Sequence, residues 1–155
     1  MALLPRSRVR AALLLLASIF FLFAGVSHFT SPTFFVSIVP PYLPAHLALV
    51  YVSGVFEVLG GLGLLVPATR RPAGWGLLAL LVAVYPANVH MAMNPEAFVA
   101  QDTPLWALYL RLPLQFVFMA WVWWATKPET PVPSPRRTRA PRAEEIPWTA
   151  PGSGT

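Results

Sequence analysis

Few residues in this chain could do chemistry, and each lies in or beside a long apolar segment. Glu57 is the only charged side chain between Arg10 and Arg70, and it occurs within YVSGVFEVLGGLGLL, residues 51–65. A carboxylate surrounded by hydrocarbon is costly, so it normally faces polar groups inside a bundle or a cavity. The glycines around it permit close approach of a neighbouring helix, as small residues do in membranes. We therefore expect Glu57 to face inward.

Several polar residues on other segments could meet Glu57. Arg111 lies about seven residues inside an apolar segment, and Gln115 follows one turn later on the same helical face. At a rise of about 1.5 Å per residue, Arg111 and Glu57 lie at depths in the membrane that permit an ion pair between them. Such a pair could bind a ligand or only fix helix register. The predicted polar cluster, a candidate ligand or pairing site, comprises His28, Ser53, Glu57, Asn88, His90, Arg111 and Gln115.

The chemistry open to this cluster is proton handling and hydrogen bonding rather than a recognisable catalytic or metal motif. A histidine, a carboxylate and an arginine could hydrogen-bond the carbonyls of a quinone and handle its protons. His28 and His90 could flank a haem, or bind a metal together with Glu57, but their spacing forms no motif. The alternative is that both histidines are hydrated helix ends. We predict no catalytic residue and no metal ligand.

The composition is that of a membrane protein. Hydrophobic residues make up 56% of the 155 residues and charged residues 11%, against about 25% charged in soluble domains. The chain has no cysteine, which excludes disulfides, thiol relays and iron–sulfur ligation by this chain alone. The net charge of +5 is concentrated outside the apolar segments, which favours a role in membrane topology over nucleic-acid binding.

Four apolar segments are long enough to cross a bilayer. We predict an all-α fold, a four-helix transmembrane bundle, with spans at about residues 11–29, 45–66, 73–91 and 104–125. The first segment lacks a convincing A-x-A cleavage site, so we interpret it as a retained span rather than a signal peptide.

Prolines mark the connections and two positions within spans. Their density in residues 30–46 predicts an interfacial loop or a short half-helix. Residues 94–103 are predicted to form a polar loop. Pro86 and Pro113 lie inside the third and fourth spans, where we expect a locally opened backbone around a polar pocket.

The basic residues predict the orientation. Ten of the eleven Lys and Arg residues lie in residues 1–10, in the turn at Arg70 and Arg71, or after residue 126. The positive-inside rule then places both termini in the cytoplasm. Residues 127–155 have too little apolar surface to fold and are predicted to be a disordered tail whose arginines touch anionic lipid.

Three stretches carry a family resemblance: AGVSHF at residues 24–29, SGVFEVLGGLGLLVP at residues 53–67 with TRRPAGWGL after it, and YPANVHMA at residues 85–92. Together they resemble the DoxX family of small bacterial membrane proteins, over a four-span domain at residues 11–126. The resemblance implies an inner-membrane bundle linked to quinone or redox systems. It carries over no catalytic residue, but the positions that match its polar signature are His28, Glu57, Asn88 and Arg111.

The function expected from the resemblance is that of a non-enzymatic accessory subunit, which binds a partner protein of a membrane redox system. One alternative is a quinone-reactive oxidoreductase component, with quinone as the candidate cofactor. A second alternative is a pathway for a small solute or protons, although four spans without an internal inverted repeat leave little room for alternating access. The expected partners are the lipid bilayer, a redox-complex protein and a second copy of the chain, but no nucleic acid.

Overall fold

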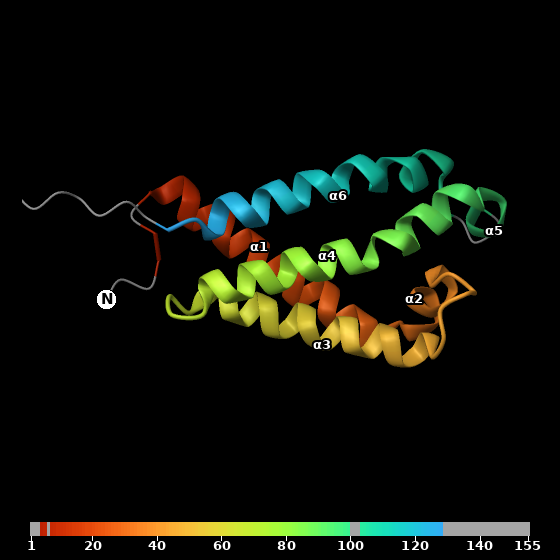
Figure 1. Ribbon diagram of the computed structural model, residues 1–155. Coiled ribbons are helices and arrows are strands. Elements are labelled where there is room, and N and C mark those ends of the chain that lie inside the picture. Colours follow the sequence, from red (N-terminus) through yellow and green to blue (C-terminus); the bar gives the residue numbers. More distant parts are fainter. Residues whose placement is uncertain (1–3, 6, 100–102, 129–155) are drawn as a thin grey trace, which may run out of the picture.

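The computed structural model describes residues 4–5, 7–99 and 103–128, and within those ranges it is helical and contains no strand. Four helices are long and apolar enough to cross a membrane: α1 (Arg8–Thr30), α3 (His46–Leu65), α4 (Arg70–Met93) and α6 (Leu105–Thr126). Two short helices, α2 (Pro32–Ile38) and α5 (Pro95–Val99), lie together at one end of the bundle (Figure 1). The predicted all-α fold with four long apolar helices is confirmed.

The connections differ in part from the expectation. The proline-rich segment after α1 contains the short helix α2, which is one of the two forms expected for it. The segment predicted as a polar loop contains α5, which begins at Pro95, a residue whose fixed φ suits the first helical position. Helix α6 ends at Thr126. The predicted disordered tail from residue 129 onward, with its arginines, lies outside the described residues.

Both internal prolines lie within continuous helices. Helix α4 continues through Pro86 and α6 continues through Pro113, so neither helix is interrupted, and the expected local opening of the backbone stays a prediction. A side chain from the neighbouring helix nevertheless reaches the backbone near Pro86, because Gln115 Nε2 donates to the carbonyl oxygen of Leu81 at 2.6 Å. The carbonyl that loses its donor to Pro86 is that of Val82, so this bond to Leu81 ties α4 to α6 but does not replace the missing backbone bond.

The main hydrophobic core fills one half of the bundle, which we call the packed half. Its members come from all four long helices and are almost completely buried: Leu14, Ala17, Phe21, Leu64, Leu77, Leu81, Val122 and Ala125. A smaller cluster of Met91, Phe98 and Leu108 lies at the other end, beside α5. In a bundle that crosses a membrane, such a core stabilises the fold through close packing rather than through exclusion of water, because lipid is as apolar as leucine.

Glycines bring α1 and α3 into backbone contact. A Cβ placed on Gly25 would lie 2.8 Å from the carbonyl oxygen of Gly54 and 2.9 Å from the amide nitrogen of Val58. Further along the same interface, Ser18 donates its hydroxyl to the carbonyl oxygen of Gly61 at 2.7 Å. Only residues without side chains permit this approach, as the glycine-rich segment predicted.

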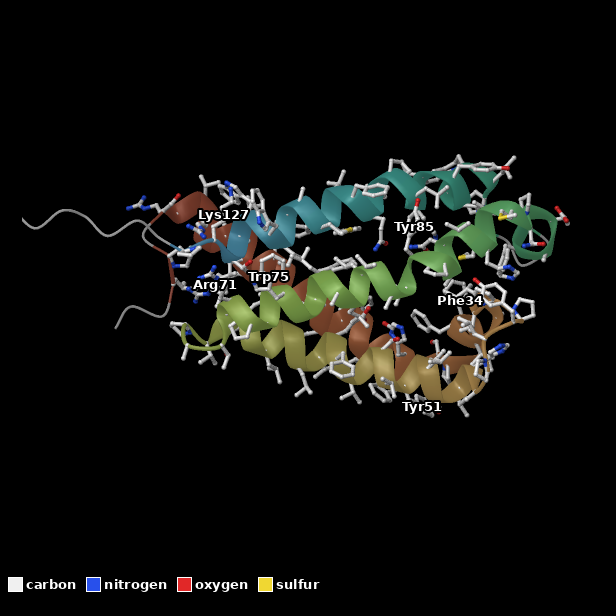
Figure 2. All side chains as sticks on the ribbon, viewed as in Figure 1. Phe34, Tyr51, Arg71, Trp75, Tyr85 and Lys127 are labelled. Carbon is white, nitrogen blue, oxygen red and sulfur yellow. The ribbon has the colours of Figure 1, made fainter. Side chains whose placement is uncertain are left out.

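Apart from Arg111, the described Lys and Arg residues lie at the end of the bundle where α1 begins and α6 ends, which we call the basic end. Arg10 Nε donates to the carbonyl oxygen of Ala125 at 3.2 Å, and Arg70 Nε donates to that of Leu64 at 2.9 Å. These bonds satisfy carbonyls left free at the ends of α6 and α3. Arg71 and Lys127 lie at this end as well (Figure 2), with Lys127 Nζ 3.5 Å from the ring centroid of Trp123.

Candidate functional site

A pocket of about 460 Å³ lies in the half of the bundle opposite the basic end, where α3 and α4 diverge (Figure 1). Residues from α1, α2, α3, α4, α6 and the loop before α3 line it. Most of the lining is apolar, and the polar side chains in it are those of His28, Ser53, Glu57, Asn88 and Arg111. An apolar cavity with a few converging polar groups is the usual form of a small-molecule site.

The pocket reaches the outer surface of the bundle between α3 and α4. Five of its apolar lining residues, on α3 and α4, are also exposed, namely Leu49, Val52, Phe56, Ala83 and Pro86. In a helix that crosses a membrane, this surface faces lipid rather than water.

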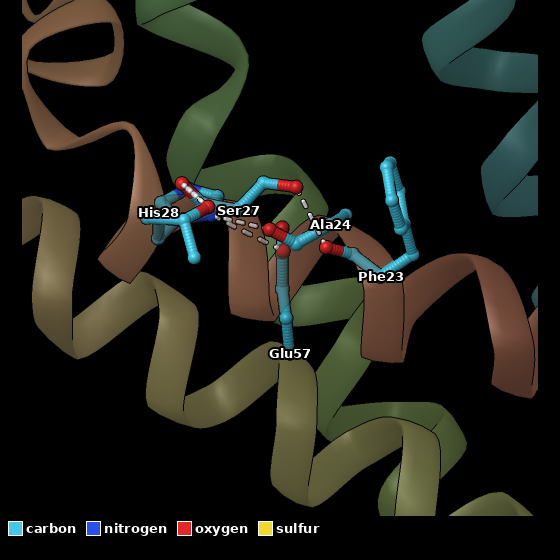
Figure 3. A network of polar contacts seen from close by, with 6 residues as sticks. Phe23, Ala24, Ser27, His28 and Glu57 are labelled. Carbon is cyan, nitrogen blue, oxygen red and sulfur yellow. Dashed lines mark hydrogen bonds and ion pairs between the residues drawn. The ribbon is translucent and has the colours of Figure 1, made fainter.

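His28 and Glu57 meet at the α1 and α3 side of the pocket (Figure 3). His28 Nδ1 lies 3.5 Å from Glu57 Oε2, and both side chains are almost buried. Each follows an interface glycine by three residues, since Gly25 precedes His28 and Gly54 precedes Glu57. A Cβ on Gly54 would lie 2.7 Å from the Cβ of His28. The close contact of the two helices thus sets the distance between the histidine and the carboxylate.

The proton on His28 Nδ1 is directed away from Glu57. Nδ1 lies 2.9 Å from the carbonyl oxygen of Ala24, and a carbonyl can only accept, so Nδ1 is the donor of this bond. Glu57 Oε2 is left buried with no hydrogen-bond partner among the described residues. In the neutral ring the other nitrogen, Nε2, is an acceptor, and it makes no hydrogen bond within the part of the chain that the structure describes. The ring of Phe35 stacks on His28 with centroids 3.8 Å apart.

Arg111 lines the pocket from α6 but does not pair with Glu57. Its Nη1 donates to Met91 Sδ at 3.5 Å, a weak acceptor, and its guanidinium carbon lies 6.0 Å from the ring centroid of Phe34. Among the described residues no carboxylate lies within ion-pair distance of it. The expected Arg111–Glu57 pair is therefore wrong. Similar depth along two helices did not bring the side chains together, because they project from different sides of the pocket.

Asn88 is held in a defined orientation by Gln115. Gln115 Nε2 donates to the carbonyl oxygen of Leu81, so its other amide atom, Oε1, is the acceptor of the 3.0 Å bond from Asn88 Nδ2. Asn88 Oδ1 is consequently left without a donor in the described ranges. The chain of two bonds fixes α4 against α6 and presents an amide oxygen at the pocket wall.

Two members of the predicted cluster lie outside the pocket lining. Gln115 is buried behind Asn88, where it acts through that residue. His90 instead contacts Asn94, with 3.1 Å between His90 Nδ1 and Asn94 Nδ2, and packs edge-on against Phe98. Within residues 4–5, 7–99 and 103–128 no group of three His, Cys, Asp or Glu side chains could hold a metal ion.

The aromatic part of the site could not be identified from the sequence. Phe35 belongs to the short helix α2, which folds back so that its ring covers His28. Phe56 is adjacent to Glu57 in the sequence and also lines the pocket. Both occur in segments where almost every residue is apolar, so nothing in the pattern distinguishes a pocket wall from a surface that faces lipid.

The comparisons with known proteins give a different family from the one that the sequence motifs suggested. No curated protein and no solved structure matches the chain. The family model that matches is not that of DoxX, so the DoxX resemblance is wrong. The short stretches that suggested it are rich in Gly, Ala, Val and Leu, which packed membrane helices share for physical reasons. The match covers residues 16–126, all four long helices in part or whole, and the chain belongs to the family described as "Domain of unknown function (DUF8561)".

Proposed function

We propose that this protein is an integral membrane protein that binds a small lipid-soluble molecule, of the size and polarity of a quinone head group, in the pocket between α3 and α4. The observation that carries the proposal is the pocket itself, about 460 Å³ with apolar walls and five polar side chains. A flat ring could lie beside Phe35 and Phe56, with its polar substituents at His28 and Glu57 on one side and Arg111 on the other. Pockets of this size and polarity bury most of a small ligand.

The proposed orientation has both termini in the cytoplasm and the pocket in the outer half of a bacterial inner membrane. The described basic residues Arg8, Arg10, Arg70, Arg71 and Lys127 support it, because they gather at the end of the bundle away from the pocket. Lys and Arg are enriched on the cytoplasmic side of membrane proteins. A ligand would then enter from the outer leaflet.

The other two interpretations have less support. The accessory-subunit interpretation depended on the DoxX resemblance and loses that support with it. A pathway for a solute or protons would have to continue past the pocket, where side chains such as Leu14, Phe21 and Leu77 fill the packed half. Binding in a pocket with one lateral opening needs neither a partner protein nor a path through the bundle.

The test is a ligand-dependent rise in melting temperature of the full chain, purified in mild detergent. A decyl-substituted 1,4-quinone and its hydroquinone, added at saturation, should each raise the melting temperature. Ala87→Trp, which fills the pocket from α4, should abolish the shift, whereas Ala79→Trp, at an exposed position on the same helix, should keep it. No shift with either compound, or an equal shift in Ala87→Trp, would refute the proposal.

A further inference from the structure

Some polar atoms of the pocket have hydrogen-bond partners among the described residues, and others have none. Glu57 Oε2 is buried and receives no hydrogen bond from the part of the chain that the structure describes. His28 Nε2 and Asn88 Oδ1 are likewise acceptors that have no donor among the described residues, because the other atoms of these two side chains are engaged by Ala24 and Gln115. Three side chains of the pocket thus present acceptors that the protein does not satisfy.

Most donors of the pocket lie on another side, on Arg111, while the hydroxyl of Ser53 on α3, one turn before Glu57, can both donate and accept. Arg111 has five N–H groups, and only the weak bond to Met91 Sδ uses one of them within the described chain. Arg111 belongs to α6, whereas His28 and Glu57 belong to α1 and α3. A ligand that spans the pocket would therefore meet the guanidinium donors of Arg111 at one end, and at the other the unsatisfied acceptors together with the hydroxyl of Ser53.

From this arrangement we propose that the pocket selects a ligand with a hydroxyl donor on an aromatic ring, and binds a hydroquinone more tightly than the corresponding quinone. This inference depends on the proposed function and specifies the ligand of the same site. One hydroxyl of a hydroquinone donates to Glu57 Oε2 or His28 Nε2, and the oxygen at the opposite end of the ring accepts from Arg111. A quinone has only acceptors, so it satisfies Arg111 and leaves the buried carboxylate oxygen unpaired.

The rings of Phe35 and Phe56 in the lining favour an aromatic ligand over a simple alcohol, and the charge of Arg111 disfavours an ammonium. The rings of His28 and Phe35, with centroids 3.8 Å apart, present flat apolar faces next to the acceptor atoms, and aromatic rings pack well in offset or edge-on contact with such faces. Phe56 adds a third ring to the wall. The lateral opening between α3 and α4 suits a ligand whose alkyl substituent remains in the bilayer.

The experiment compares three ligands on the full chain in mild detergent under anaerobic conditions. The probes are a decyl-substituted 1,4-hydroquinone, the matching 1,4-quinone and the dimethyl ether of the hydroquinone, which keeps the ring but has no donor. Because a new hydrogen bond also satisfies a buried acceptor, the dissociation constant of the hydroquinone should be about tenfold lower than those of the quinone and the ether. The quinone is no larger than the hydroquinone, so its weaker binding cannot come from size.

Variants identify the acceptor. Glu57→Gln, which brings its own N–H donors to the site, should bring the affinities for hydroquinone and quinone close to each other. Glu96→Gln makes the same chemical change outside the pocket and should keep the tenfold preference. His28→Phe retains an aromatic ring beside Phe35 but removes the imidazole acceptor, and it should also reduce the preference.

The outcomes separate the two proposals. Binding of the hydroquinone and the quinone with equal affinity to the wild-type protein, or a preference for the quinone, would overturn the donor inference while leaving a quinone-sized site in place. Failure of all three probes to bind would overturn the proposed function. If Glu57→Gln did not fold, the comparison of the three ligands on the wild-type protein would still decide.

Discussion

The two halves of this bundle are built from the same four helices but differ in how closely those helices pack. In the packed half, buried side chains such as Phe21, Leu64 and Leu77 meet without access to the surface. In the pocket half, α3 and α4 diverge and a cavity opens between them, with a buried carboxylate oxygen that lacks a hydrogen bond. The comparison indicates that one half holds the fold together and the other half is left free to bind.

The boundary between the halves runs through α4 near Leu81. The side chain of Leu81 belongs to the core cluster, while its carbonyl oxygen accepts the bond from Gln115 that orients Asn88 in the pocket. The α1–α3 interface crosses the boundary as well, because Ser18 and Gly61 lie beside the core and Gly25 and Gly54 lie beside His28. Close packing in one half therefore fixes the positions of polar groups in the other.

The largest expected difference between the halves is the cost of removing an aromatic ring. Phe21→Ala should lower the free energy of unfolding by about 3 kcal/mol, because it leaves a closed cavity in a packed core. Phe35→Ala only enlarges a pocket that is already open, and it should cost about 1 kcal/mol or less. Unfolding by SDS titration in mixed micelles measures both. Equal losses would mean that the pocket half is as important for stability as the core.

The glycine interface is the next largest effect. Gly25→Ala should lower the free energy of unfolding by about 2 kcal/mol, because the added Cβ would meet backbone atoms of α3 that cannot move aside. Gly76 is the matched control, since a Cβ there would have no atom within 4 Å. Gly76→Ala should leave stability unchanged or raise it in the same titration. A loss in Gly76→Ala as large as that in Gly25→Ala would indicate a general effect of glycine replacement.

Glu57 should behave in the opposite sense from a core residue. Without ligand, Glu57→Gln should raise the free energy of unfolding by about 1 kcal/mol. The neutral amide replaces a buried carboxylate whose Oε2 receives no hydrogen bond from the described residues. Thermal unfolding of the ligand-free variant measures this, with Glu96→Gln expected to change nothing. A gain in stability combined with loss of hydroquinone preference would identify Glu57 as a binding residue, whereas destabilisation would identify it as a structural one.

The sequence predicted the features that depend on composition along the chain. Long apolar segments predicted the four helices, and the glycines around Glu57 predicted its inward position and the close contact with α1. The charge of Arg70 and Arg71 predicted a basic turn at one end of the bundle, where Arg70 also caps α3. These properties follow from hydropathy, residue size and charge, which can be counted without coordinates.

The partners of the polar residues could not be predicted in the same way. Counting residues gives the depth of Arg111 and Glu57 but not the direction of their side chains around the helix axes, so His28 rather than Arg111 is the neighbour of Glu57. The position of Phe35 depends on how the proline-rich segment folds back, and the acceptor role of Asn88 depends on Gln115. Such details come from packing between segments, which a hydropathy pattern does not encode.

The smallest expected effect concerns the bond between Asn88 and Gln115. In a double-mutant cycle, Asn88→Ala and Gln115→Ala should show a coupling energy of about 0.6 kcal/mol, the usual size for side-chain hydrogen bonds between membrane helices. The cycle of Glu57→Gln with Arg111→Gln provides the reference and should be additive, because the structure gives these two residues no contact. SDS titration of both sets of variants measures the couplings. Additive effects of Asn88→Ala and Gln115→Ala would mean that this hydrogen bond does not stabilise the pocket wall. Coupling between Glu57→Gln and Arg111→Gln would mean that the two charges interact across the pocket.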